Sequence, residues 1–274
     1  MNKSIIFSLL FTLSFTACAK TASDSYFGEQ QSSSKKEYES FRKNIAKAFE
    51  NQTPKEWGEN VSGVKTKLDT NEKVVVLTMD ACGSPLGMGY DEELINFLKQ
   101  EKVPATLFIN ARWIDKNLNT FKTLASNPLF EIANHGLEHK PASVNGKSIY
   151  GLDGSKNIEE FVDEIELNAR KIEQITHKRP IYFRSGTAYY DEVAVKIANK
   201  LNHQVIGFSI LGDAGATFSK EKVENAFLKS KNGEIVIIHM NHPESQTAEG
   251  TIKAIKELKQ KGFRFVKLAD YKLK

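Results

Sequence analysis

The sequence predicts an α/β protein in which parallel strands alternate with helices. Its 274 residues, 40% of them hydrophobic, can bury a large core and exclude a wholly disordered chain. From residue 73 onward, short apolar runs alternate with amphipathic stretches of helical period. Strands that alternate with helices favour parallel pairing through right-handed crossovers. About seven such strand–helix units fit either a barrel or a wide open sheet.

Residues 1–17 have the features of a secretory signal peptide. Lys3 precedes an apolar run over 5–15, which is too short for a membrane-spanning helix of about 20 residues. The small residues before Cys18 resemble the lipobox of bacterial lipoproteins, which implies cleavage before Cys18 and acylation of its thiol. Ordinary signal-peptide cleavage after Ala19, in an A-x-A pattern, is the alternative.

We therefore expect an exported lipoprotein of the periplasm or the cell surface, held to the membrane by a lipid anchor. The Ser- and Gln-rich part of 18–34 would be a flexible tether. The formal charge of +4 falls to +3 when Lys3 is removed and gives no argument for a nucleic-acid partner. No protein partner is inferred. If Cys18 is lipidated, Cys82 has no intramolecular partner, and it is either a core thiol or a site residue.

The elements after the tether follow from local patterns. Apolar residues at helical spacing predict a helix over 35–49, within an N-terminal helical extension over 35–69. The run over 74–78 is apolar throughout, as expected of a strand buried on both faces. The other expected helices are 91–100, 118–126, 158–176, 191–201, 220–229 and 247–260. The other expected strands are 105–109, 130–133, 181–183, 205–209, 235–238 and 264–267.

Chemically distinctive residues follow the carboxyl ends of several predicted strands. They are Asp80, His135, Arg184, Asp213 and His239. In parallel α/β folds this end of the sheet carries the active site. Core packing does not explain five such residues at one rim, so we expect a catalytic site there.

A metal ion is one expectation from these residues. His135 and His139 are four residues apart, and on a helical turn they would share a face and could hold one metal. Asp80 ends a buried strand, where a carboxylate can be a metal ligand, a general base, or the acceptor of a turn or helix cap.

Proton transfer and charge stabilisation are the other expectation. A guanidinium at a strand end, such as Arg184, can hold a carboxylate in a fixed orientation. The glycine-containing loop after it can direct backbone N–H groups near Thr187 at an oxyanion. Asp213 can raise the pKa of His239 toward the value that a general acid needs.

Taken together, these segments resemble the polysaccharide deacetylases of the NodB type, carbohydrate esterase family four. The family's five motifs correspond to TMDACG from Thr78, HGLEH from His135, RSGTAYY from Arg184, GFSILGDAG from Gly207 and IIH from Ile237. The resemblance covers about residues 70–268, and we assign 70–274 to this domain. It implies a distorted (β/α)7 barrel with an N-terminal helical extension, and a divalent metal, which is most often Zn²⁺.

The resemblance also implies roles for individual residues. The metal ligands would be His135 and His139. The groups that transfer or position protons would be Asp80 as general base, Arg184 as its holder, His239 as general acid and Asp213 as its partner. The substrate contacts would be Thr187, Tyr189, Ile237 in the acetyl pocket and Phe208.

One position departs from the resembled family. Ala81 stands where that family has a second aspartate, which is a metal ligand. Three substitutes are open: Asp80 becomes the third ligand, Cys82 supplies a thiolate, or water completes a weak site. We favour Asp80, although zinc also accepts cysteine.

The activity that the resemblance implies is metal-assisted amide hydrolysis. The chain would be a polysaccharide N-deacetylase that removes N-acetyl groups from cell-wall peptidoglycan or a related glycan. A hydrolase of a non-sugar amide is one alternative. A carbohydrate-binding pseudoenzyme is the other, because Ala81 removes an expected ligand.

Overall fold

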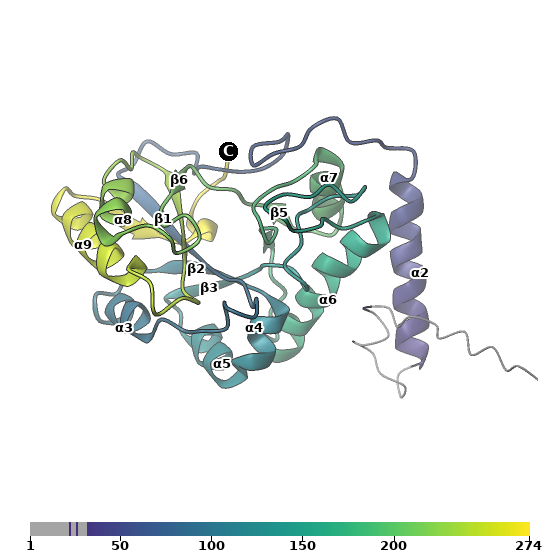
Figure 1. The fold of residues 1–274 in the computed structure, drawn as a ribbon, viewed down its shortest axis with the longest axis horizontal. Helices are drawn as coiled ribbons and strands as arrows, with labels where there is room; N and C mark the ends of the chain where they lie inside the picture. Colours follow the sequence, from purple (N-terminus) through teal and green to yellow (C-terminus); the bar gives the residue numbers. More distant parts are fainter. Residues whose placement is uncertain (1–21, 23–25, 27–31) are drawn as a thin grey trace, which may run out of the picture.

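The computed structural model describes residues 22, 26 and 32–274, and a curled parallel sheet lies at its centre (Figure 1). The order of the strands is β5-β4-β3-β2-β1-β7-β6, and β8 pairs with β1. The strands are β1 (Val74–Ala81), β2 (Ala105–Ile109), β3 (Phe130–Asn134), β4 (Tyr182–Phe183), β5 (Gln204–Val205), β6 (Ile210–Leu211), β7 (Glu234–His239) and β8 (Arg264–Val266). The predicted α/β fold is confirmed as a parallel half-barrel sheet surrounded by helices.

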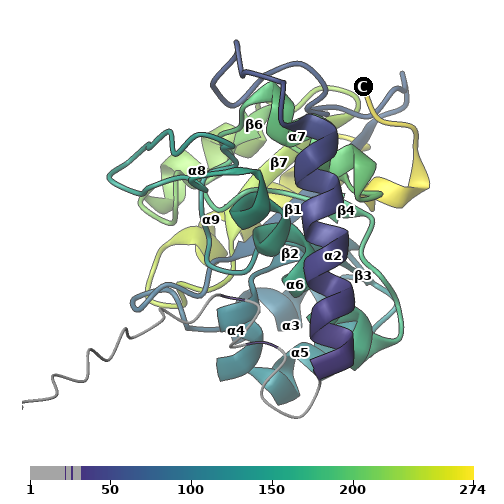
Figure 2. The same cartoon turned by 90° about the vertical axis from the view of Figure 1, so that its right-hand side faces the viewer.

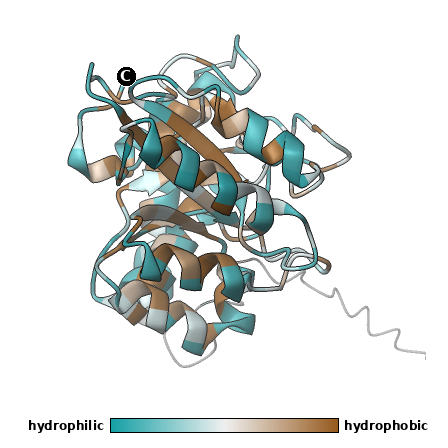
Figure 3. Cartoon of the chain, turned by 90° about the vertical axis from the view of Figure 1, so that its left-hand side faces the viewer, coloured by the Kyte–Doolittle hydropathy of each residue, from teal (hydrophilic) through white to brown (hydrophobic). Residues whose placement is uncertain are grey.

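Helices cover the outside of this sheet, and their apolar sides face it, as the brown and teal faces in Figure 3 show. Several begin with an aspartate, asparagine or serine that accepts a hydrogen bond from the first turn, such as Asp91, Asn157 and Ser219. The helices are α2 (Ser32–Phe49), α3 (Glu92–Gln100), α4 (Ala111–Lys116), α5 (Leu118–Ser126), α6 (Ile158–Thr176), α7 (Glu192–Lys200), α8 (Lys220–Phe227) and α9 (Thr247–Gln260), followed by the 3-10 turn η1 (Leu268–Asp270).

Strand β1 is the centre of the fold, and every residue in it is buried. On one edge it pairs with β8 at residues 74–76 and with β2 at 78–81, and on the other edge with β7 at 75–80. Its side chains alternate between two layers, as a strand requires. Val74 and Val76 belong to the apolar cluster inside the curl, whereas Met79 and Ala81 belong to the cluster under the helices.

The prediction of one strand over 205–209 is wrong. Two short strands stand there instead: β5 pairs with β4 at one edge of the sheet, and β6 pairs with β7 at the other. The residues between them cross the opening of the half-barrel. Lys65 pairs with this segment, since its N–H donates to Val205 O and Gly207 N donates to Lys65 O, both at 2.9 Å. Residues before the domain therefore line the gap that the sheet leaves open.

The helix expected over 35–49 is observed as α2, which begins at Ser32 and ends at Phe49 as predicted, and the rest of the extension runs over the edge of the sheet as isolated bridges. Helix α4 was not predicted, because its six residues are too few for a periodic pattern. Among the described residues, no helix has the length and apolarity to cross a membrane. The apolar run over 5–15 and Cys18 lie outside the described residues.

Helix α2 packs along α6, as Figure 2 shows from the side. A buried polar group joins them: Tyr38 OH donates to Asp163 Oδ1 at 2.6 Å, and Arg42 Nη1 donates to Asp163 Oδ2 at 2.7 Å. Since Asp163 is only 5% exposed, its carboxylate depends on these donors. The extension is thus fixed to the α/β domain by specific contacts.

We expect Tyr38→Phe to lower the free energy of unfolding by about 1–3 kcal/mol, because it leaves a buried carboxylate oxygen without this donor. Urea unfolding of the folded chain measures the change. Tyr150→Phe makes the same substitution on a side chain that is 69% exposed, and it should have little effect. Equal stabilities of the two variants would show that this contact does not hold α2 in place.

Candidate active site

Strand ends place the distinctive residues on one rim of the half-barrel. Asp80 lies near the end of β1, and the strand register sets it directly opposite His239 at the end of β7. His135 follows β3 and Arg184 follows β4. Asp213 follows β6, and its carboxylate binds His239. The carboxyl ends of parallel strands meet at one edge, which is why residues far apart in sequence gather here.

Arg184 is fully buried and holds Asp80. Its Nη1 donates to Asp80 Oδ1 at 2.7 Å and to Thr78 Oγ1 at 2.9 Å. Its Nη2 donates to Gly207 O at 2.8 Å, and its plane lies over the Phe108 ring at 4.2 Å. Asp80 is 2% exposed, so its charge is compensated by a cation with a fixed direction.

Asp213 fixes His239 at two points. Oδ1 accepts from His239 Nδ1 at 2.9 Å, and Oδ2 accepts from the backbone N–H of His239 at 2.7 Å. Thr247 Oγ1 donates to the same Oδ2 at 3.2 Å, and Asp213 is completely buried. The ring therefore has one orientation, with Nε2 left for other contacts.

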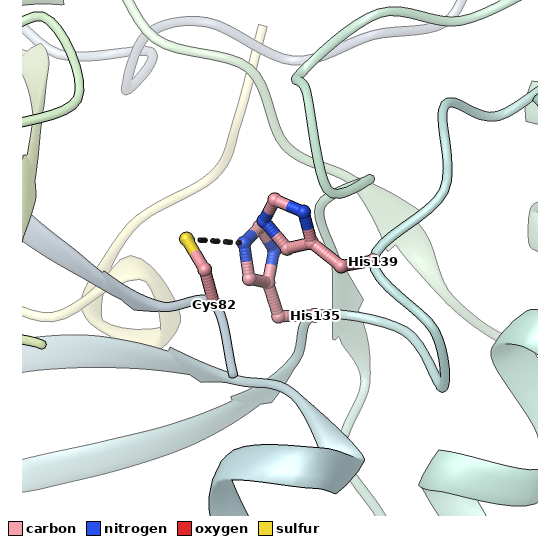
Figure 4. Close-up of side chains that lie close together, drawn as sticks. All are labelled: Cys82, His135 and His139. Carbon is pink, nitrogen blue, oxygen red and sulfur yellow. Dashed lines mark hydrogen bonds between the residues drawn. The ribbon is translucent and has the colours of Figure 1, made fainter. Parts of the chain in front are cut away.

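A cluster of one thiol and two imidazoles lies beside these pairs. One ligand atom from each of Cys82, His135 and His139 lies within 4.8 Å of the others, and Figure 4 shows the three side chains converging. Cys82 Sγ is 3.7 Å from His135 Nε2. Asp80 Oδ2 is 3.6 Å from His135 Nε2, so this carboxylate lies beside the group, although it is not one of its three members.

The two histidines approach each other through a turn that is not helical, which corrects the helical turn expected from their spacing. Gly136 has φ of +79°, and a side chain there would collide with the buried carboxylate of Glu164. That carboxylate accepts the backbone N–H groups of Glu138 and Lys140 and so shapes the turn. The ring centroids of the histidines end 4.9 Å apart and nearly perpendicular.

The donors fit a divalent metal. His135 Nδ1 pairs with Arg184 O at 3.0 Å, so this nitrogen carries the proton and Nε2 offers its lone pair to the group. Metal-binding histidines are usually held in this way. His139 Nε2 is buried and has no hydrogen-bond partner within the part of the chain that the structure describes. Two imidazoles and a thiol are donors that zinc accepts.

The electrostatics of the group favour ionised partners. Burial raises the pKa of the Cys82 thiol, but the charge of His139 and hydrogen bonds from the surrounding imidazoles outweigh it and hold that pKa well below its ordinary value. Burial lowers the pKa of His239, but Asp213 raises it well above the usual value. The protonated state of His239 is the one that a general acid needs.

The expected substrate residues lie in three places. Ile237 is buried in β7 beside Thr78, and Phe208 packs between two apolar clusters in the segment that crosses the gap. Thr187 has a buried hydroxyl without a partner in the described region, and it follows Gly186, whose Cα packs against His139. These residues border the rim from opposite edges of the sheet.

Tyr189 belongs to an aromatic cluster that the sequence did not reveal. Its ring centroid is 5.9 Å from that of Trp57 and 5.6 Å from that of Tyr150. Trp57 reaches it because Gly58 exchanges two backbone hydrogen bonds with Tyr190. The contacts of Trp57 and Gly58 join segments more than a hundred residues apart, so no local pattern could have shown them.

Comparison with known proteins identifies the family. Residues 67–206, half of the chain, match the family described as polysaccharide deacetylase. The chain belongs to the polysaccharide deacetylase family. The predicted enzyme class, a polysaccharide N-deacetylase, is confirmed by this family and its relatives. A peptidoglycan-N-acetylglucosamine deacetylase of Bacillus cereus is 26% identical over 211 residues, which are 76% of this chain and 92% of that protein.

Solved structures agree with this assignment. A mutant of a CE4 family pseudoenzyme from Bacillus anthracis, with restored enzymatic activity, has a TM-score of 0.63 at 25% identity, over 78% of this chain and 72% of that one. A peptidoglycan N-acetylglucosamine deacetylase in complex with a benzamide ligand has a TM-score of 0.65 at 22% identity, over 77% and 92%. The second likeness bears on the fold alone.

Proposed function

We propose that this chain is a metal-dependent hydrolase that removes N-acetyl groups from an N-acetylated polysaccharide, with cell-wall peptidoglycan or a related glycan as substrate. The observation that carries the proposal is the register that sets Asp80 opposite His239 beside a metal-binding group. Amide hydrolysis needs such a base and such an acid. The relative from B. cereus, named for its action on peptidoglycan, supports the choice of substrate.

His135 and His139 would hold the metal, and zinc is the ion we propose, because imidazole and thiol donors suit it. When bound, a divalent ion supplies Lewis-acid polarisation and lowers the pKa of water. The sequence Asp80-Ala81-Cys82-Gly83 would be a variant of the family's first motif.

The residues around the metal site divide the proton transfers. Asp80, held by Arg184, accepts the proton of the attacking water. His239, charged through Asp213, donates its proton to the amine that leaves. The new C–O bond forms first and gives a tetrahedral oxyanion, and the amide C–N bond then breaks, which yields acetate and a free amino sugar. A backbone N–H near Thr187 would steady the oxyanion.

Acetate release from peptidoglycan fragments and from N-acetylglucosamine oligomers tests the proposal. We expect release that a chelator abolishes and added Zn²⁺ restores. His135→Ala should behave like the metal-free protein. His177→Asn, which changes an exposed histidine at the end of α6, should release acetate normally. Absence of release from every glycan at saturating metal would contradict the proposal.

A carbohydrate-binding pseudoenzyme is the second candidate. Two observations favour it: Ala81 occupies the place of a metal-binding aspartate, and a family pseudoenzyme is among the structural relatives. Such a protein would bind the glycan oligomers without releasing acetate. Calorimetric titration beside the acetate assay separates the two candidates.

The aromatic cluster suits a sugar ring, because ring faces offer large apolar contact with a polar rim. We expect Trp57→Ala to raise KM for glycan oligomers several-fold with kcat nearly unchanged, since the cluster lies outside the proton-transfer groups. Steady-state kinetics on oligomers of increasing length measure this effect. Tyr271→Phe near the C-terminus is the control and should leave KM unchanged. The other tryptophan, Trp113, is buried and therefore cannot serve as the control. A fall in kcat with KM unchanged would assign the cluster to another role.

We also propose export and lipidation. The support is the sequence alone: the apolar run over 5–15 and the residues before Cys18. The protein would then lie in the periplasm or on the cell surface with its lipid in the membrane. When cells are grown with a labelled fatty acid, we expect the native chain to incorporate the label and Cys18→Ser not to incorporate it. Incorporation into both chains would refute the assignment.

A further inference from the structure

We propose that the Cys82 thiolate is the third protein ligand of the metal, so that the site is a Cys-His-His centre and Asp80 remains free to act as base. The inference rests on the proposed metal dependence and assigns a ligand role to the residue that follows Ala81. It differs from the expectation, favoured on sequence grounds, that Asp80 itself becomes the third ligand.

The direction of β1 gives the first argument. Thr78 and Asp80 point into the half-barrel, where both meet Arg184, while Met79 and Ala81 point under the helices. Side chains of a strand alternate, so the next one to face the site after Asp80 is Cys82. Ala81 is completely buried in the apolar layer, and its methyl group offers no ligand atom.

Distances give the second argument. Sγ of Cys82 and one nitrogen from each of His135 and His139 lie within 4.8 Å of one another. Metal–ligand bonds of about 2.0–2.3 Å put the ligand atoms of a tetrahedral ion about 3.3–3.8 Å apart, and Cys82 Sγ and His135 Nε2 are 3.7 Å apart. Cys82 is 8% exposed and is not part of any of the apolar clusters of the described chain, so core packing does not account for it.

The hydrogen bonds of Asp80 give the third argument. Its Oδ1 accepts from Arg184 at 2.7 Å, and this guanidinium is itself fixed by Thr78 and by the carbonyl of Gly207. Binding the metal through Oδ2, which lies 3.6 Å from His135 Nε2, would engage both carboxylate oxygens and leave neither free to accept a proton from water. The Cys82 thiol is hydrogen-bonded by the imidazoles of His135, His139 and His239, and no guanidinium of the described residues holds it.

The two histidines give the fourth argument. His135 is already held as the tautomer that presents Nε2, through its bond to Arg184 O. His139 Nε2 is buried without a hydrogen-bond partner among the described residues, and His139 adopts a left-handed φ of +63° to bring it there. A buried, unpartnered nitrogen in a strained turn is explained by an ion that it binds.

The consequence is a preference among metals. Thiolate and imidazole donors favour Zn²⁺ and Co²⁺ over Mg²⁺ and Ca²⁺, which prefer oxygen. Three protein ligands leave one position of a tetrahedral ion open, as catalytic zinc sites do. The thiol proton passes to solvent as the metal binds.

Cobalt substitution tests the ligand without reference to activity. We expect the Co²⁺ form of the full chain to show an intense near-ultraviolet charge-transfer band from thiolate to metal. Cys82→Ser should lose this band and bind Zn²⁺ at least about 10–100-fold more weakly, the loss that even outer partners of a ligand cause. Asp80→Asn should keep both the band and one bound metal, and Cys82→Asp should bind metal without the band.

Two results would overturn the assignment. One is stoichiometric Co²⁺ in the native chain with no charge-transfer band. The other is a band and a zinc affinity that survive in Cys82→Ser, or metal lost in Asp80→Asn alone. A thiol that acts as nucleophile with His239 and Asp213 would instead trap an acyl group on Cys82 in metal-free protein, which mass spectrometry detects and which also refutes the proposal. Failure of acetate release with the band intact would count against the proposed function and leave the ligand assignment standing.

Discussion

His239→Ala is expected to lower kcat by about 10²–10⁴-fold while the bound metal stays in place. Burial lowers the pKa of this ring, but the buried carboxylate of Asp213, which binds Nδ1 and the backbone N–H, raises it well above the usual value. Without it, the leaving amine must depart unprotonated or take its proton from water. Acetate release and metal content, measured on the same preparation, give the two readouts.

A matched control lies three residues further along. His242 is also a histidine of this segment, but its Nδ1 pairs with the exposed Glu244 at 2.9 Å, so His242→Ala should leave kcat nearly unchanged. Loss of metal in His239→Ala would contradict the role assigned here and would make this side chain a ligand. Unchanged kcat would exclude it as the acid.

Much of the fold could be predicted because its signals are local. The run that forms β1 is apolar throughout, and the strand is buried on both faces. The bounds expected for α6 and α9 equal those observed, because a capping asparagine or a long amphipathic repeat marks them. The polar residues at the ends of the expected strands then predicted a site at the carboxyl edge of the sheet, because parallel strands end at the same edge.

The misjudged features depend on contacts that no local pattern encodes. The 205–209 segment reads as one apolar strand, yet its two ends pair at opposite edges of the sheet. The turn between His135 and His139 has helical spacing, but Glu164 from α6 shapes it by accepting backbone N–H groups. Trp57 joins the site only through pairing of Gly58 with Tyr190.

Cys82 illustrates how sequence and structure complement each other. The sequence resemblance implies that Ala81 stands in place of a metal ligand. Strand alternation puts both Asp80 and Cys82 on the face of Arg184 and the histidines, so it does not choose between them. Their contacts differ, because Asp80 binds the Arg184 guanidinium whereas Cys82 lies among imidazoles.

Arg184→Met should remove both stability and activity. The side chain is 0% exposed and donates to Asp80, Thr78 and two backbone carbonyls. Methionine keeps the volume but leaves the carboxylate of Asp80 buried without its cation, a change that typically costs about 3–5 kcal/mol. Urea unfolding measures the stability, and acetate release at a temperature where the variant is folded measures the activity.

Arg184→Lys separates the two effects if the methionine variant does not fold. Lysine keeps the charge but is a single point donor, so it cannot bridge Asp80, Thr78 and Gly207 as the planar fork does. We expect partial recovery of stability, because lysine still compensates the charge of Asp80. We expect kcat to stay low, because the carboxylate is no longer held in one orientation. Arg264→Met removes an exposed ion pair with Glu72 and should change neither quantity much. Full activity in Arg184→Lys would mean that charge alone positions the base, and the directional role of the guanidinium would have to be abandoned.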